Sequence, residues 1–97
     1  MLTNKQKRFL RKEAHRLKPV VQVGKSGVNE NVIQTTKEAI EARELIKVNV
    51  LQNCLERKED VAHTLAENIK AEIVQVIGNI IILYKESKEN KQIELPQ

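Results

Sequence analysis

Hydrophobic positions along the chain repeat with two different periods, and each change of period marks an expected element. Apolar residues spaced by three and four positions predict helices over residues 3–17, 29–43 and 57–71. Alternating or consecutive β-branched residues predict strands over residues 20–23, 45–51, 73–77 and 80–84. Gly78-Asn79 separates the last two strands and is a linker typical of tight hairpins. The predicted order is α-β-α-β-α-β-β.

This order predicts one α+β domain, an α/β sandwich. Strands separated by helices favour parallel neighbours, whereas the hairpin pair must be antiparallel, so the sheet is mixed and four-stranded with helices packed on it. The pattern leaves open whether one face of the sheet stays uncovered. We expect the domain over residues 1–86 and a polar, frayed tail over residues 87–97.

Local signals mark several boundaries. Thr3 and Gln6 have the spacing of a capping box at the start of the first helix. Pro19 stops that helix and favours an extended conformation at the preceding residue. Asn29 is a suitable cap for the second helix.

Charge is unevenly distributed along the chain. Residues 1–25 hold eight basic residues against one acidic residue, a net +7, and the remaining residues hold nine basic against twelve acidic, a net −3. A strongly positive segment attracts polyanions. Charge alone does not distinguish RNA, DNA, anionic lipid and acidic protein.

Several classes of protein are disfavoured. No run approaches the roughly 20 apolar residues of a membrane-spanning helix, and the charged N-terminus lacks the apolar core of a signal peptide. The single cysteine, Cys54, cannot form an internal disulfide, so we expect a cytoplasmic protein. Phe9 and Tyr84 are the only aromatic residues, too few for a sheet face that stacks bases.

Neither a catalytic nor a metal-binding constellation is evident. His15 and His63 lack metal-ligand spacing with Cys54. Glu59 and His63 are one helical turn apart, which more often means a surface pair than an acid–base site. We expect no enzyme, no metal, no cofactor and no small-molecule substrate.

Gly24-Lys25-Ser26-Gly27 is the strongest candidate for function. It separates a predicted strand from a predicted helix, and its glycines permit a sharp turn and a close approach of another backbone. The loop amides and the first helical turn would present positive partial charge to one place, where Lys25 adds a full charge. Alone, such a loop is often only a turn. The basic helix upstream is expected to converge on the same surface, which favours phosphate binding.

Two other interpretations, one of the Gly24–Gly27 segment and one of the first helix, are rejected. A nucleotide-binding P-loop needs a glycine five residues before Gly24, and that position is Pro19. The first helix could lie on a membrane surface, but its apolar side is short and holds one aromatic residue. We expect that side to be buried in the domain.

Several segments, in order along the chain, carry a resemblance to a known family. They are Leu2-Thr3-Asn4-Lys5-Gln6-Lys7, Leu17-Lys18-Pro19, Val23-Gly24-Lys25-Ser26-Gly27, Glu44-Leu45-Ile46-Lys47-Val48, and the run from Val76-Ile77-Gly78 through Leu83-Tyr84. Over residues 1–86 the chain resembles a CRM domain (chloroplast RNA splicing and ribosome maturation), specifically the stand-alone bacterial YhbY-like proteins.

The resemblance implies a fold similar to the C-terminal domain of bacterial translation initiation factor 3, with a KH-like G-x-x-G loop. It also implies binding to ribosomal RNA in precursors of the large ribosomal subunit, and so a role in ribosome assembly. We expect a monomer. Carried over residue by residue, the expected RNA contacts are Gly24, Lys25, Ser26 and Gly27, extended by Lys5, Lys7, Arg8, Arg11, Lys12, Arg16 and Lys18 of the basic first segment and by Lys47 of the second strand.

Two further hypotheses stay open. The basic helix could dock an acidic protein partner, which would make the chain a protein-interaction module. DNA binding is less favoured, because no helix-turn-helix spacing or dimer-forming segment is visible. For the RNA hypothesis, replacing Gly27 by Asp is expected to abolish binding while leaving the domain folded.

Overall fold

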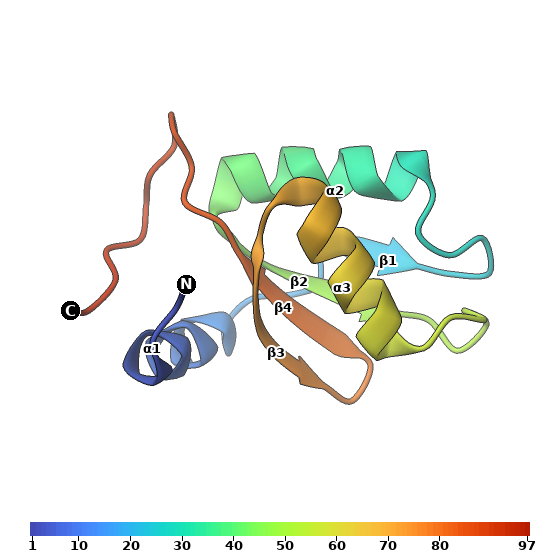
Figure 1. Cartoon of the computed structure of the whole chain (residues 1–97), viewed down its shortest axis with the longest axis horizontal. Helices are drawn as coiled ribbons and strands as arrows, with labels where there is room; N and C mark the ends of the chain where they lie inside the picture. Colours follow the sequence, from blue (N-terminus) through green and yellow to red (C-terminus); the bar gives the residue numbers. More distant parts are fainter.

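The computed structural model describes all 97 residues and contains three helices and one four-stranded sheet (Figure 1). The elements are α1 (Asn4–Ala14), β1 (Val21–Val23), α2 (Glu30–Arg43), β2 (Leu45–Val50), α3 (Lys58–Ile69), β3 (Glu72–Ile77) and β4 (Ile80–Tyr84). The predicted α+β class and element order are confirmed.

The sheet has the strand order β1-β2-β4-β3. β1 is parallel to β2, and β4 is antiparallel to both β2 and β3. The prediction that strands joined through a helix are parallel neighbours is right for β1 and β2 but wrong for β2 and β3. β4 separates those two strands because its residues Ile81, Ile82, Leu83 and Tyr84 are all buried, and a strand that is apolar on both faces belongs in the centre of a sheet.

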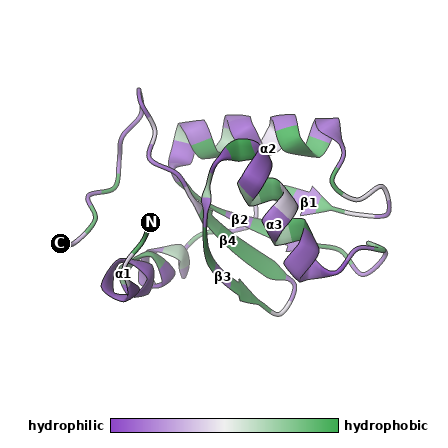
Figure 2. Cartoon of the chain, in the orientation of Figure 1, coloured by the Kyte–Doolittle hydropathy of each residue, from purple (hydrophilic) through white to green (hydrophobic).

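Helices lie on both faces of the sheet. Figure 1 shows α2 and α3 on one face and α1 on the other. The larger core lies under α2 and α3 and includes Ile40, Ile46, Val48, Leu65, Ile81 and Leu83. The smaller core lies under α1 and consists of Leu10, Ala14, Leu45, Val74, Ile82 and Tyr84. In Figure 2 the strands are mainly hydrophobic and α1 is mainly hydrophilic, so only one narrow side of α1 enters the core.

The first helix begins where the sequence predicts and ends earlier. Both halves of the capping box are present, with the Gln6 N–H donating to Thr3 Oγ1 at 3.1 Å and the Thr3 N–H donating to Gln6 Oε1 at 3.0 Å. The last regular residue is Ala14 rather than Leu17. The Leu17 N–H donates to the Ala14 carbonyl at 3.0 Å, a three-residue spacing that tightens the chain into a turn before Pro19.

The C-terminal tail has no helix or strand, but it is not frayed. Glu44, at the end of α2, accepts hydrogen bonds from the N–H groups of Ser87 at 2.7 Å, Ile93 at 2.8 Å and Gln92. Ile93 and Leu95 pack against the smaller core. The prediction of a frayed end is therefore wrong, because two partly buried apolar side chains and the buried Glu44 carboxylate hold this polar segment against α2 and α1.

The face of the sheet under α1 is only partly covered. Gln22, Asn49, Ile80 and Ile77 form a row of paired residues across β1, β2, β4 and β3, at the end where β1 and β2 finish. α1 packs at the other end, around Leu45. Gln22 is exposed and Ile77 is 56% exposed. One end of this face is thus open, a point that the sequence pattern left undecided.

Candidate functional site

The GKSG loop (residues 24–27) connects β1 to α2 and carries free backbone donors. The Gly27 N–H donates to the Gly24 carbonyl at 2.9 Å and closes a turn. The N–H groups of Gly24, Lys25 and Ser26 donate to no acceptor in the protein, and the side chains of Lys25 and Ser26 are exposed. The loop therefore has three adjacent N–H groups and one ammonium that no acceptor within the protein occupies.

The second glycine of the loop is required by its backbone and by a neighbour. Gly27 has φ +68°, in the left-handed region, and a Cβ there would collide with Glu56 Oε1. The same Glu56 oxygen accepts a hydrogen bond from the Val28 N–H at 2.9 Å. An acidic side chain thus lies directly on the loop. Sequence reasoning missed it, because 28 residues separate Glu56 from Val28 and no spacing rule links them.

The start of α2 is already capped and carries a negative charge. Asn29 caps the helix, and its side-chain oxygen accepts a hydrogen bond from the Val32 N–H at 2.9 Å. Glu30 places a negative charge in the first turn. Part of the helix dipole is therefore already compensated within the protein. The N–H groups of Asn29, Glu30 and Asn31 donate to no acceptor within the protein, so free donors lie both in residues 24–26 and at the start of α2.

The basic residues of the first segment lie on and just after α1. Lys5, Arg8, Lys12, Arg16 and Lys18 are exposed, and Lys7 and Arg11 are half-buried. Arg16 pairs with Glu13 at 3.0 Å, an exposed contact, and Lys5 Nζ donates to the Gln97 carbonyl at 3.0 Å. Lys7, Arg8, Arg11, Lys12 and Lys18 form no ion pair and no side-chain hydrogen bond within the protein. This surface holds several cations that are free to meet an external anion.

Lys47 holds the connection between α1 and β1. Its Nζ donates to the Leu17 carbonyl at 3.0 Å. The side chain is half-buried on the face of the sheet that α1 covers. Two of its three N–H donors remain. In this arrangement Lys47 is first a structural residue, and it is less available to a ligand than the exposed lysines of α1.

The structure does not bring the GKSG loop and α1 together. The loop lies at the end of the sheet where β1 and β2 finish, whereas α1 packs around Leu45 at the start of β2 (Figure 1). Six residues of β2 separate these ends, a span of about 17 Å at about 3.3 Å per residue. The predicted convergence on one compact surface is not observed. The loop and α1 are two separate candidate regions for binding phosphate.

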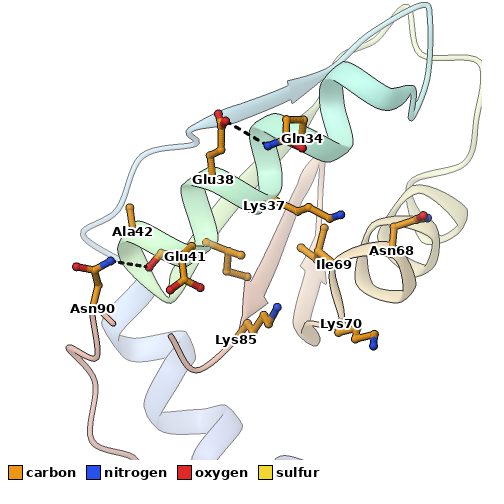
Figure 3. Close-up of a pocket in the computed structure, with 11 residues that line it drawn as sticks. Gln34, Lys37, Glu38, Glu41, Ala42, Asn68, Ile69, Lys70, Lys85 and Asn90 are labelled. Atoms are coloured by element: carbon orange, nitrogen blue, oxygen red, sulfur yellow. Dashed lines mark hydrogen bonds between the residues drawn. The ribbon is translucent and has the colours of Figure 1, made fainter. Parts of the chain in front are cut away.

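The largest cavity lies elsewhere, between the C-terminal halves of α2 and α3. It has a volume of about 630 Å³, and Lys37, Lys70 and Lys85 are among its lining residues (Figure 3). In Figure 3, Lys37 extends from α2 toward α3. None of the three lysines forms an ion pair, although Glu38 and Glu41 line the same cavity. This cluster was not predictable from spacing along the chain, because the three lysines belong to different parts of the fold.

Two other properties concern the whole chain. None of the three helices combines the length and the apolar character needed to cross a membrane. No group of three or more His, Cys, Asp or Glu side chains is placed to hold a metal ion. Cys54 is half-buried, and its thiol makes a long contact of 3.7 Å with the Glu56 carbonyl.

Fold and site together describe a small α+β domain with a glycine-flanked loop and a separate basic helix, both suited to a polyanion. The model of one protein family, the CRS1 / YhbY (CRM) domain, matches residues 2–85. The chain therefore belongs to the CRM family, and the predicted resemblance is confirmed.

Known relatives match almost the whole chain. The protein named Probable RNA-binding protein YqeI, from Bacillus subtilis, is 67% identical over 96 residues, which cover 99% of this chain and 100% of that protein. An RNA-binding protein of Haemophilus influenzae is 42% identical over 96 residues, covering 99% of this chain and 96% of that one. The solution structure of SAV1595 from Staphylococcus aureus has a TM-score of 0.83 at 56% identity and covers 99% of this chain and 100% of that chain.

Proposed function

We propose that this protein binds RNA through the GKSG loop and α1, and that it acts as a cytoplasmic monomer in assembly of the large ribosomal subunit. The observation that carries the proposal is the row of free N–H groups at Gly24, Lys25 and Ser26 beside an exposed ammonium. Phosphate oxygens are the acceptors that such a turn suits. The names of the relatives support RNA as the partner. The ribosomal role and the location rest on the family resemblance.

The available groups favour recognition of the RNA backbone. The loop offers backbone N–H groups and α1 offers ammonium and guanidinium groups, and all of these bind phosphate without reading base edges. With two aromatic residues in the chain, base stacking contributes little. We therefore expect binding to folded RNA through its shape and phosphate positions, with a strong dependence on salt.

The loop is best tested at its two exposed positions. The double variant Lys25→Glu with Ser26→Asp removes no hydrogen bond within the protein and puts two negative charges on the loop. We expect affinity for a transcribed fragment of large-subunit ribosomal RNA to fall about tenfold or more at constant salt. Unchanged affinity would rule out the loop as a contact. Gly27→Asp is a poorer test, because strain at φ +68° and repulsion by Glu56 would disturb the loop itself.

A control variant separates a local effect from net charge. Lys88→Glu with Asn90→Asp changes the charge by the same amount at two exposed positions of the tail. We expect this variant to bind the same RNA within about twofold of the parent protein. Far-UV circular dichroism checks that each variant is folded.

The ribosomal role has its own test. Cell extract is sedimented through a sucrose gradient, and the fractions are probed for this protein. We expect it to co-migrate with the large subunit and its precursors at low salt. Its presence only in the soluble fractions would contradict the ribosomal part of the proposal and leave RNA binding intact.

One observation favours a second candidate function. Because α1 and the loop lie at opposite ends of the sheet, α1 could dock an acidic protein while the loop serves another purpose. Affinity capture of this protein before and after nuclease treatment separates the two. A partner protein that stays bound after RNA digestion would favour docking, and complete loss of partners would favour RNA.

A further inference from the structure

The loop that we propose as the phosphate contact already holds an anion from its own chain. Glu56 belongs to the segment between β2 and α3, and its Oε1 accepts a hydrogen bond from the Val28 N–H at 2.9 Å. The same oxygen is the nearest atom to the place where a Cβ of Gly27 would be. Gly27 is buried, although Lys25 and Ser26 beside it are exposed, because Glu56 covers it.

The hydrogen bond between Val28 and the Glu56 carboxylate is weakly held. The Glu56 side chain is exposed, forms no ion pair, and has one hydrogen bond, the one from Val28. Residues 51–57 contain no helix or strand, so the carboxylate is free to rotate into water without disturbing a regular element. A phosphate oxygen is the same kind of acceptor as a carboxylate oxygen. Rotation of Glu56 would therefore extend the free donors of residues 24–26 by a fourth.

We propose that RNA binding exchanges the Glu56 carboxylate for an RNA phosphate at the Val28 N–H. This inference rests on the function proposed above and adds a specificity-determining residue to it. A tethered carboxylate competes at an effective concentration in the millimolar range. A single free phosphate displaces it poorly, whereas an RNA that is also held by Lys25 and α1 displaces it well. Glu56 thereby restricts the loop to ligands with several linked phosphates.

The first test compares two variants that remove one negative charge each. Glu56→Gln keeps the shape of the side chain and removes its charge, and Glu30→Gln does the same at a nearby exposed position that makes no hydrogen bond to the loop. We expect Glu56→Gln to bind ribosomal RNA about 2- to 5-fold more tightly than Glu30→Gln at the same salt. Equal affinities, or weaker binding by Glu56→Gln, would overturn the exchange.

The second test observes the Val28 amide by nuclear magnetic resonance and uses Glu56→Ala. We expect RNA to shift the Val28 amide signal in the parent protein, while inorganic phosphate at millimolar concentration does not. In Glu56→Ala, inorganic phosphate alone should shift it, because the position is vacated. The proposal would be overturned if inorganic phosphate left the Val28 amide signal of Glu56→Ala unchanged, or if it shifted that signal in the parent protein.

The loop contact and the exchange at Glu56 can be contradicted separately. If RNA shifts the amides of Lys25 and Ser26 but leaves Val28 unchanged, the loop binds RNA and the exchange is wrong. If RNA binds without shifting the amide signals of Lys25, Ser26 and Val28, both the proposed loop contact and the exchange are wrong.

Discussion

Gly24 and Gly27 close the two ends of the GKSG loop for different physical reasons. Gly27 has a positive φ of 68° and no room for a Cβ. Gly24 has no positive φ, and a Cβ there would lie 3.4 Å from Asn53 Oδ1 and 3.5 Å from Leu51 Cδ1, which is ordinary contact. Two glycines that look equivalent in the sequence are therefore unequal in the fold.

Alanine substitutions at these glycines should separate the two roles. Gly27→Ala is expected to lower the free energy of unfolding by about 1–2 kcal/mol, because alanine is strained at positive φ and Glu56 must move. Gly24→Ala should change it by less than about 0.5 kcal/mol, since the added methyl group fits and the unfolded chain becomes less flexible. Urea denaturation followed by circular dichroism measures both. Equal losses would contradict this account.

Glu44 is a buried charged residue whose backbone and side chain are both held in place. It is fully buried and has a positive φ of 66°, at a helix end where glycine is usual. Three backbone N–H groups of the tail, from Ser87, Gln92 and Ile93, donate to its carboxylate. These bonds replace the water that the charge loses and offset the backbone strain.

The same carboxylate should make stability depend on acidity. Burial by itself raises the pKa of Glu44, but the N–H groups of Gln92, Ser87 and Ile93 and the charge of Lys91 together bring it below its ordinary value of 4.5. Because the folded-state pKa is lower than that of the unfolded chain, the stabilisation is complete well above pH 4.5. It is lost as the pH falls through 4.5 toward the folded-state pKa.

Measured free energies of unfolding between about pH 3 and pH 7 test this dependence. The parent protein should lose stability on acidification more steeply than Glu44→Gln, which has no charge to lose. The control is Glu67→Gln, because Glu67 is exposed and forms no hydrogen bond or ion pair. This variant should keep the steepness of the parent protein. An equally steep loss in Glu44→Gln would assign the pH dependence to other groups.

At the scale of the elements, the periodicity of apolar residues was sufficient to predict which helices and strands exist and in what order they follow along the chain. All seven helices and strands were predicted, because each has a buried face with its own spacing of apolar residues. The position of β4 between β2 and β3 was not predictable, since it depends on which strand is apolar on both faces once the helices are placed. The tail was misjudged because its anchor, Glu44, lies more than 40 residues earlier.

The candidate site was predictable only in its local part. The GKSG loop follows from its two glycines and its place between a strand and a helix. Glu56 and the separation of α1 from the loop depend on long-range packing, which neighbouring positions in a sequence do not report. β1 carries the chain from the α1 end of the sheet to the loop end, so adjacency in sequence did not become adjacency in space.

The role of α1 in RNA binding is testable on its exposed side. Arg8 and Lys12 are four residues apart, exposed, and without a partner in the protein. Arg8→Glu with Lys12→Glu should leave the fold intact and weaken RNA binding. Each phosphate contact that is lost should make the plot of log affinity against log salt shallower by about 0.7–0.9. An unchanged slope in salt titrations would show that α1 does not contact phosphate.

The whole molecule is elongated, and the GKSG loop and α1 lie apart along it. The Cα positions extend over 39 × 26 × 23 Å. On the face of the sheet that α1 partly covers, the open row through Gln22, Asn49 and Ile77 lies toward the loop end. An RNA that contacts both α1 and the loop would pass along this uncharged strip. The fold therefore suits an extended backbone path rather than one compact anion site.

Combining the loop variant with the α1 variant tests this path. If one RNA molecule spans both regions, the losses of binding free energy from Lys25→Glu/Ser26→Asp and from Arg8→Glu/Lys12→Glu should add within about 0.5 kcal/mol, because the sites are well separated and share no partner. Titration of the same RNA fragment at one salt concentration measures all four proteins of the cycle. If α1 instead docks a protein, its variant should bind RNA like the parent, and the combined variant should bind like the loop variant alone. A combined loss much smaller than the sum would mean that RNA engages the two regions in alternation, since a single bound path along the sheet requires both.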